Sequence, residues 1–143
     1  MSSPVQLLRV PGLAPVPYAY AAVVDPTRRL VLTAGACPLD ADGRTVAVGD
    51  PVGQAERVLD NLTATLAAAG AGLTDVVRTT VYVASSDRAD LGAVWEVVAD
   101  RFGDHDVPST LLGVAALGWP DQLVEIEAVA VADSEPVPPA DPR

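Results

Sequence analysis

Cysteine and histidine are scarce in this chain of 143 residues, which has one of each, Cys37 and His105. A single cysteine cannot form an internal disulfide or a multi-cysteine metal site, and His105 has no partner ligands at metal spacing. We therefore expect no metal and no cofactor, and we expect His105 to be a solvated loop residue. The lack of cysteine pairs agrees with a reducing compartment, so the predicted location is cytoplasmic.

Long apolar runs are also absent, although half of the residues are hydrophobic. A membrane-spanning helix needs about 18 consecutive apolar residues, and a secretory signal has a basic flank before an apolar segment. Neither pattern occurs, so we expect no membrane partner and no export.

Basic residues are few, because the chain has 9 of them against 19 acidic residues, for a net charge of −10. A protein with this charge repels phosphate backbones and lacks the basic stripe that supplies most nonspecific affinity for nucleic acids. Nucleic acid is therefore not an expected partner.

The length fits one domain, which by size scaling buries roughly 70% of the surface of its unfolded chain. We expect this domain to span residues 1–133. Residues 134–143 contain four prolines and are expected to form a disordered or loosely attached tail.

The clearest local pattern is a helix followed by a strand. Apolar residues recur at helical spacing from residue 54 onward and make one stripe, formed by Ala55, Val58, Leu59, Leu62, Leu66 and Ala69. Polar residues, Gln54 among them, fall outside this stripe. Gly70 ends the helix, and residues 76–83 are rich in β-branched side chains, which favour a strand.

A second helix is predicted to follow a cap at Ser86 or Asp87, with Gly103 beyond its last turn. Its apolar stripe consists of Leu91, Val94, Trp95, Val98 and Phe102. Further strands are predicted at residues 6–10, 18–24, 29–35, 110–116 and 123–132. The order β-β-β-α-β-α-β-β indicates an α+β fold in which two helices cover one face of a mixed sheet.

The last strand has two different faces. Its apolar face is expected under the helices and consists of Val124, Ile126, Ala128 and Ala130. The opposite face carries Glu125 and Glu127, which are tolerable there only if they meet water, a partner subunit or a polar cleft.

Residues 76–83 also alternate. One face is formed by Val77, Thr79, Val81 and Val83, and the other by Val76, Arg78, Thr80 and Tyr82. Both faces of the sheet therefore carry apolar groups, which implies association with a partner.

The segment "QAERVLDNLTATLAAAGAGLTDVVRTTVYVASSDRADL", together with "YAYAAVV", "LVLTAGACPLDADGRTV" and "LVEIEAVAV", resembles the Rid family. These reactive intermediate deaminases are also called YjgF or L-PSP endoribonuclease-like proteins, and the resemblance covers residues 17–132. It implies a chorismate-mutase-like fold and a homotrimer in which three sheets form a central barrel. It also implies small-molecule clefts between adjacent subunits.

The deaminase branch of this family surrounds each cleft with a tyrosine, a serine, an asparagine, an arginine, a cysteine and a glutamate. The arginine binds the substrate carboxylate as a bidentate pair, and the glutamate helps to position or activate the water that attacks an imine carbon. In this chain Tyr18 matches the tyrosine and Glu125 matches the glutamate. The resemblance thus makes Tyr18 and Glu125 candidate catalytic residues.

The other four positions differ from the family pattern. Thr110 stands at the arginine position, Leu112 at the cysteine position and Trp95 where the asparagine is common. The family motif "SGQIP" reads "AGACP" here, so its serine is replaced in the segment Ala34, Gly35, Ala36 and Cys37. We expect this segment, Trp95 and Leu112 to line the ligand cleft, with Thr110 as a third candidate catalytic residue.

The missing arginine predicts a change of substrate. A desolvated bidentate pair with a carboxylate is worth roughly 2–5 kcal/mol, and a threonine offers only one neutral hydroxyl. Imines derived from amino acids, with a free carboxylate, are therefore expected to turn over poorly. Neutral, cationic or aromatic ligands are favoured, with Trp95, Leu112 and Trp119 as apolar surface.

Each candidate also has a purely structural interpretation. Glu125 could bind backbone amides or a neighbouring subunit, and Tyr18 could pack with its hydroxyl satisfied. Trp95 lies on the core-facing stripe of its helix, which favours packing. Thr110 could be an ordinary strand threonine, and Glu127 is expected to be structural.

Three functions remain open at this point. The first is an enzyme in which Glu125 acts as acid or base on an imine, an enamine or another reactive intermediate without a carboxylate. The second is a non-catalytic module that binds or senses an apolar metabolite. The third is an ordinary enamine or imine deaminase in which Arg78 or Arg101 replaces the missing arginine.

Overall fold

The computed structural model describes residues 4–133 and residue 141, so the predicted tail at 134–143 lies, apart from Asp141, outside the described residues. The elements follow the predicted order, with a short 3₁₀ turn (η1) added before the fourth strand. They are β1 Val5–Leu8, β2 Ala21–Val24, β3 Arg29–Leu32, α1 Pro51–Ala68, η1 Leu73–Asp75, β4 Val76–Val83, α2 Arg88–Phe102, β5 Ser109–Gly113 and β6 Val124–Ala132. The α+β class is confirmed.

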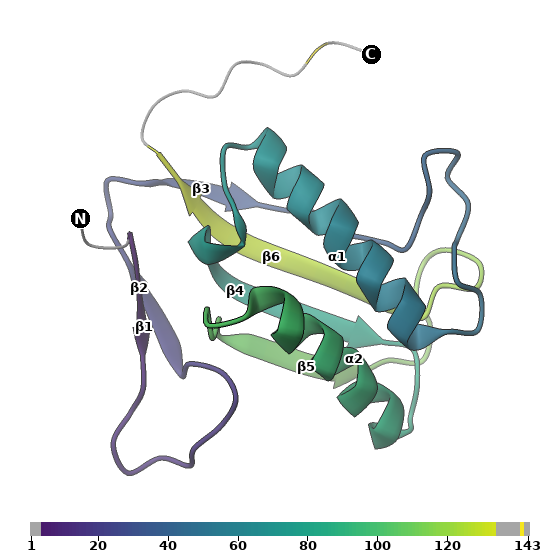
Figure 1. Cartoon of the computed structure of the whole chain (residues 1–143), viewed down its shortest axis with the longest axis horizontal. Helices are drawn as coiled ribbons and strands as arrows, with labels where there is room; N and C mark the ends of the chain where they lie inside the picture. Colours follow the sequence, from purple (N-terminus) through teal and green to yellow (C-terminus); the bar gives the residue numbers. More distant parts are fainter. Residues whose placement is uncertain (1–3, 134–140, 142–143) are drawn as a thin grey trace.

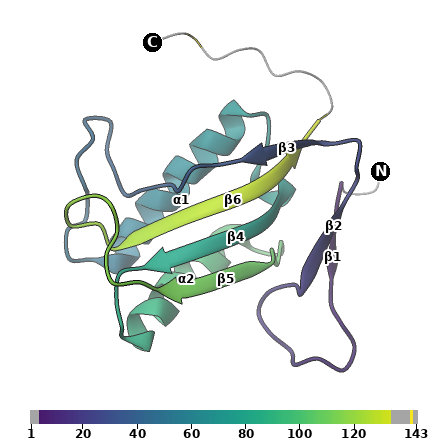
Figure 2. The same ribbon diagram turned by 180° about the vertical axis from the view of Figure 1, so that it is seen from behind.

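A four-stranded sheet in the order β3-β6-β4-β5 forms the centre of the molecule. β4 and β5 are parallel and are joined through α2, while β6 is antiparallel to both of its neighbours. Both helices cover one face (Figure 1), and the view from behind shows the opposite face without a helix over it (Figure 2). We call this second surface the open face.

β1 and β2 form a separate two-stranded sheet, which differs from the single mixed sheet that the sequence predicts. β1 is also shorter than predicted. It ends at Leu8, before Pro11, and the guanidinium of Arg9 binds the carbonyl oxygens of Val16 and Tyr18 at 2.8 and 2.6 Å. The loop between the two strands thereby closes on itself.

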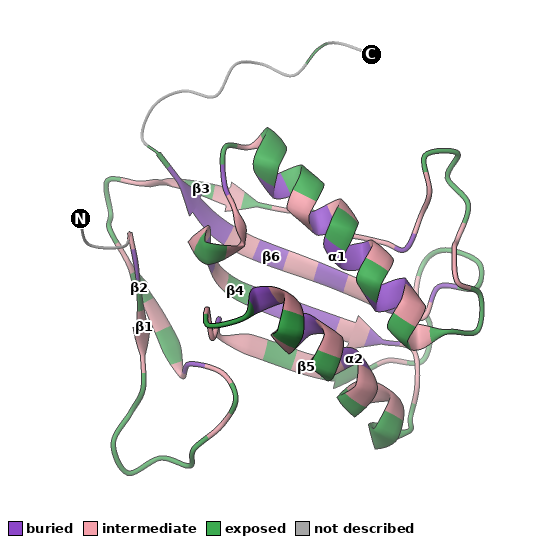
Figure 3. Cartoon of the chain, in the orientation of Figure 1, coloured by how far each residue is buried: buried purple, intermediate pink, exposed green. Residues whose placement is uncertain are grey.

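The core lies between the helices and the sheet, and the helix residues that face the sheet are the buried ones (Figure 3). Leu59, Leu62 and Leu66 of α1 are fully buried, as are Val81 of β4 and Ile126 of β6. The apolar face of the last strand thus packs under the helices as predicted, and Glu125 lies on the open face.

The predicted faces of β4 are wrong at its start. Val76 pairs with Ala130, but Arg78 pairs with Val129, so Val77 is an extra residue in a β-bulge. Because a bulge shifts the alternation by one residue, Val76 is buried on the helix side together with Thr79, Val81 and Val83.

Helix starts follow from side-chain caps and proline. The carboxylate of Asp50 accepts a hydrogen bond from the amide of Gly53 at 3.0 Å, and Pro51 occupies the first helical position, so α1 begins earlier than predicted. Asp87 caps α2 through the amide of Ala89 at 2.9 Å. Asp87, rather than Ser86, is therefore the cap.

His105 is not the solvated loop residue that the sequence predicts. Its Nε2 lies 2.7 Å from the carbonyl oxygen of Val76, and its ring stacks on Phe102 with centroids 6.4 Å apart.

Among residues 4–133, no helix is long and apolar enough to cross a membrane.

Candidate functional site

The candidate residues on strands lie in two rows across the open face. Tyr82 of β4 pairs with Glu125 on one side and with Leu112 on the other. Thr80 pairs in the same way with Glu127 and Thr110. Because neighbouring strands are about 4.8 Å apart, Glu125 and Leu112 are about 10 Å apart across Tyr82.

Glu125 is held by two hydrogen bonds to the same carboxylate oxygen. The thiol of Cys37 lies 3.2 Å from Oε1, and the Nε2 amide of Gln122 donates to Oε1 at 3.2 Å. These donors come from two different loops, the segment that follows β3 and the segment that precedes β6. Glu125 therefore has a fixed orientation on the open face.

The "AGACP" segment passes directly beside Glu125. Ala36 and Ile126 exchange backbone hydrogen bonds. The amide of Ala36 donates to the carbonyl oxygen of Ile126 at 2.7 Å, and the amide of Ile126 donates to the carbonyl oxygen of Ala36 at 3.2 Å. This pairing places Gly35 against the carboxyl group, so that a Cβ at Gly35 would lie 2.5 Å from Oε2 of Glu125. Only a glycine fits here without moving Glu125.

Cys37 is a neutral hydrogen-bond donor rather than a thiolate. Burial, the hydrogen bond to Glu125 and the negative charge of Glu125 together raise the pKa of the Cys37 thiol to about 11. Hydrogen bonds from the side chains of Gln122 and Trp119 oppose this shift but do not cancel it. A thiol with this pKa is a poor nucleophile at neutral pH.

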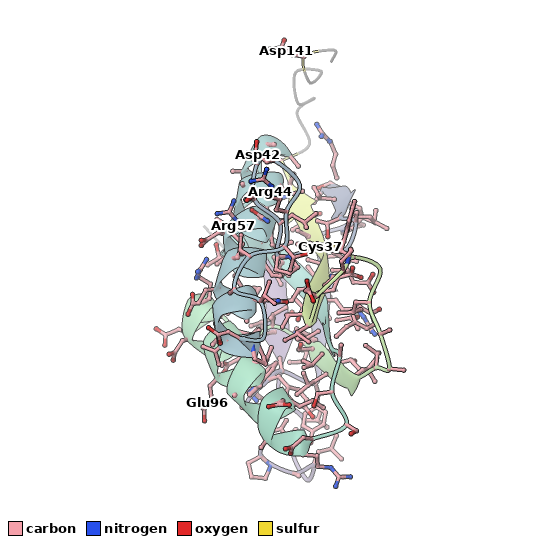
Figure 4. All side chains as sticks on the ribbon, turned by 90° about the vertical axis from the view of Figure 1, so that its right-hand side faces the viewer. Cys37, Asp42, Arg44, Arg57, Glu96 and Asp141 are labelled. Carbon is pink, nitrogen blue, oxygen red and sulfur yellow. The ribbon has the colours of Figure 1, made fainter. Side chains whose placement is uncertain are left out.

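Polar residues of α1 fix the backbone that carries Cys37. Asn61 donates to the carbonyl oxygens of Cys37 and Leu39 at 2.9 and 3.0 Å, and Arg57 donates to that of Leu39 at 3.1 Å. Figure 4, which looks at this end of the molecule, shows Cys37 on the sheet side of α1 and Arg57 on the helix.

Gln54 fixes the second loop in the same way. It is fully buried, which the sequence pattern did not predict. Its Nε2 donates to the carbonyl oxygens of Ala47 and Asp121 at 3.3 and 2.9 Å, and its Oε1 accepts the amide of Leu123 at 2.7 Å. The polar side of α1 thus aligns both loops that hold Glu125.

Tyr18 and Trp95 lie elsewhere in the chain. Their rings meet edge to face with centroids 6.1 Å apart, and Trp95 packs against the core from the helix layer. Figure 1 places the segment before β2 at the opposite end of the molecule from the start of β6. A single chain therefore does not bring Tyr18 and Trp95 to Glu125.

Two arginines were candidates to replace the family arginine, and they differ in position. Arg101 is engaged on the helix side, where it binds Glu56 at 3.0 Å and Asp60 at 2.9 Å. Arg78 is exposed and lines a depression of 230 Å³ on the open face with Thr80 and Glu127. Only Arg78 shares a face with Thr110.

Sequence reasoning missed two polar residues of this region. Tyr82 donates to Oε1 of Glu127 at 2.8 Å, and this bond is the main cause of its raised pKa. Gln122 is 4% exposed and contacts Glu125. The alternation of β4 predicts that Tyr82 lies on the open face, but it does not identify Glu127 as its hydrogen-bond partner. Gln122 lies in a loop, where no periodic pattern indicates which residues are buried.

Metal chemistry has no site among the residues that the structure describes, because no three histidine, cysteine, aspartate or glutamate side chains there are placed to hold an ion. The arrangement instead offers an oriented carboxylate beside a neutral thiol and an amide. An oriented carboxylate can transfer a proton to or from a bound ligand or water.

Comparisons with known proteins agree with this fold. A family model described as Endoribonuclease L-PSP matches residues 13–132. The RutC family protein UK114 of Drosophila melanogaster is 38% identical over 118 residues, which are 82% of this chain and 81% of the relative. The 3-aminoacrylate deaminase RutC of Acinetobacter baylyi is 32% identical over 129 residues, which are 89% of this chain and 98% of the relative.

A solved structure is similar over nearly its whole length. The crystal structure of YyfB from Yersinia pestis, described as a protein of unknown function of the conserved Rid family, has a TM-score of 0.82 and 32% identity, and the match covers 90% of this chain and 99% of that one. With these matches and the fold described above, the chain belongs to the Rid/YjgF family, which the matching model names Endoribonuclease L-PSP.

Proposed function

We propose that this protein is a homotrimer with small-molecule clefts between its subunits, in which Glu125 performs acid–base chemistry on a neutral or apolar reactive intermediate of the imine or enamine class. The observation that carries the proposal is the fixed carboxylate of Glu125, bound through Oε1 and seated against Gly35. The deaminase name of the Acinetobacter relative supports this reaction class.

Association is supported by the apolar side chains that one chain leaves exposed. Leu30 and Leu32 of β3 are 60% and 73% exposed, and Leu112 of β5 is 42% exposed. Apolar groups of this size on a sheet face favour contact with another subunit. In a single chain Tyr18 lies away from Glu125, so the two can share a cleft only if they come from different subunits.

The proposed substrate class follows from the side chains that β5 and β6 present on the open face. β5 presents Thr110 and Leu112, neither of which can neutralise a carboxylate, and β6 presents Glu125 and Glu127. A substrate carboxylate beside Glu125 and Glu127 would meet negative charge, and neither side chain of β5 offers the bidentate partner that could offset it. Neutral, cationic or aromatic ligands avoid this penalty.

Replacement of each glutamate by glutamine tests the role of Glu125. The assay follows hydrolysis of a panel of imines with and without a carboxylate, and analytical ultracentrifugation checks the trimer. Glu125→Gln is expected to lose at least about a hundredfold in kcat on the best neutral imine. Glu127→Gln, on the same strand and face, should retain most activity, because an amide oxygen still accepts the bond from Tyr82. Full activity in a trimeric Glu125→Gln would overturn the proposal.

A second candidate, the ordinary deaminase, is favoured by the position of Arg78 on the open face. In this case Arg78 would bind the substrate carboxylate, and Arg78→Met would raise KM for a 2-aminoacrylate-type imine while leaving a neutral imine unaffected.

A ligand that raises the melting temperature but is recovered unchanged in every assay would instead assign the protein to binding or sensing.

A further inference from the structure

We propose that Gln122 and Cys37 are a pair of positioning residues that hold Oε1 of Glu125 and leave Oε2 as the oxygen that exchanges a proton with ligand or water. This inference rests on the proposed function of Glu125, and it concerns residues outside the six family positions. It follows from the geometry of one buried amide, one thiol and one glycine.

Backbone groups on both sides of the Gln122 amide determine its orientation. Its Oε1 accepts the amide of Trp119 at 3.1 Å, and its Nε2 donates to the carbonyl oxygen of Val124 at 3.1 Å. A flipped amide would place its oxygen against a carbonyl and its NH₂ group against an N–H donor. The second hydrogen of Nε2 therefore has a fixed direction, and it points to Oε1 of Glu125 at 3.2 Å.

The burial of Gln122 makes this amide a specific feature rather than a surface contact. The residue is 4% exposed in a loop whose neighbours Trp119, Pro120 and Asp121 are all exposed. Burial of an amide is unfavourable unless its hydrogen bonds are made. Here they are made by two backbone groups and by Glu125.

The second donor reaches the same oxygen from another part of the chain. The Cys37 thiol lies 3.2 Å from Oε1, nearer than the carbonyl oxygen of Gly35 at 3.4 Å, and the charged carboxylate is the stronger acceptor for its single proton. Asn61 fixes the backbone of Cys37 by donating to its carbonyl oxygen at 2.9 Å. Because the pKa of the thiol is about 11, the thiol keeps its proton at neutral pH and remains a hydrogen-bond donor there. Two donors on one oxygen restrict the rotation of the carboxyl group.

Oε2 of Glu125 differs from Oε1 in its contacts. Among the described residues, no hydrogen bond reaches this oxygen, and it is seated against Gly35, where a Cβ would come within 2.5 Å. The carboxylate thus has one oxygen that accepts two hydrogen bonds and one that accepts none from the described residues. The second oxygen can accept or release a proton without breaking the bonds that orient the group.

A thiol titration tests the pairing without any substrate. Cys37 is the only cysteine, so the pH dependence of alkylation by iodoacetamide reports this site alone. The groups that act on the thiol are Glu125 of β6 and the side chains of Gln122 and Trp119. Glu125→Gln removes the negative charge, so the pKa of the Cys37 thiol should fall from about 11 toward its ordinary value, whereas Glu127→Gln should leave it unchanged. An identical thiol pKa in Glu125→Gln would overturn the pairing.

Kinetics then test the positioning role. Gln122→Met keeps the volume of the side chain and removes its donor, so kcat on the best neutral imine should fall about tenfold or more, with KM little changed and the acid limb of the pH–rate profile displaced. Cys37→Ala should show a smaller loss of the same kind, and Cys37→Ser should restore most of it. Unaltered kcat and pH profile in folded Gln122→Met or Cys37→Ala would contradict the proposal.

The two kinds of failure can be told apart. If the wild-type protein turns over no imine, the proposed function fails, while the thiol titration still decides whether Glu125 and Cys37 are paired. If the wild-type protein is active but the thiol pKa ignores Glu125, the positioning pair fails and the proposed function stands. Should Gln122→Met not fold, the Cys37 variants supply the kinetic result.

Discussion

The carboxyl group of Glu125 lies directly against the backbone of Gly35, so closely that a single methyl group at Gly35 would overlap it. This contact is created by the two hydrogen bonds between Ala36 and Ile126, which bring the segment after β3 beside β6. It explains physically why a glycine stands in a segment where Ala34, Ala36 and Cys37 differ from the family motif, and it makes the orientation of Glu125 sensitive to the smallest substitution.

Gly35→Ala should therefore displace Glu125. We expect at least about a tenfold loss of activity and a destabilisation of about 1–3 kcal/mol, the usual effect of overpacking. Activity assays and urea denaturation measure the two effects.

Gly92→Ala in α2 is the matched control, since nothing lies within 4 Å of a Cβ there. It should be neutral or stabilise by about 0.5–1 kcal/mol. Equal behaviour of the two variants would contradict the contact.

The free energy of unfolding should depend on the ionisation of Cys37 at alkaline pH. The folded state raises the pKa of this thiol from 9.0 to about 11, so it favours the protonated form. The resulting stabilisation is fully present below pH 9 and is lost as the pH rises through 11. Urea denaturation of the wild type at pH 8, 9.5 and 11 should show this decrease, and Cys37→Ser should show less of it. A parallel decrease in both proteins would mean that the thiol is not responsible.

Gln54 should contribute more to stability than its polarity suggests. Gln54→Met leaves the backbone groups of Ala47, Asp121 and Leu123 without their partner, which should cost about 2–4 kcal/mol. Gln6→Met on β1, where the residue is exposed, is the matched control and should stay within about 0.5 kcal/mol of the wild type. Thermal or urea unfolding of both variants compares them. A small effect at Gln54 would show that the two loops are held by other contacts.

Arg101 and Arg78 should differ in their effects on substrate selection. Arg101→Met removes exposed ion pairs with Glu56 and Asp60, which should cost no more than about 1 kcal/mol and leave all KM values unchanged. Under the main proposal Arg78→Met also leaves the ratio of kcat/KM for neutral and carboxylate imines unchanged. A selective loss of the carboxylate imine in Arg78→Met would favour the ordinary deaminase.

The sequence predicted the elements and the face of β6 because both depend on local periodicity. Alternation in residues 124–130 is strict, so Glu125 was correctly placed away from the helices. The same rule placed Val76 wrongly, since the bulge at Val77 shifts the alternation of β4 and has no signal in a run of β-branched residues.

The environment of Glu125 could not be predicted in the same way. Gln54 and Gln122 are buried because loop backbone groups distant in sequence require partners, and helical or strand spacing carries no information about those groups. The resemblance identified Gly35 and Glu125 as positions to compare, but the contact between them, and the hydrogen bonds from Cys37 and Gln122, emerge only when β3 and β6 are side by side.

We expect the threonine that stands in place of the family arginine to exclude imines with a carboxylate, and the rate of Thr110→Arg on a 2-aminoacrylate-type imine, generated in situ from serine, tests this expectation most directly. The wild type and the uncharged control Thr110→Met should hydrolyse this imine near the background rate. Thr110→Arg should raise kcat/KM by about 30-fold or more, equivalent to roughly 2 kcal/mol of carboxylate binding. A wild-type rate well above background that Thr110→Arg does not increase would contradict a substrate-selecting role of Thr110.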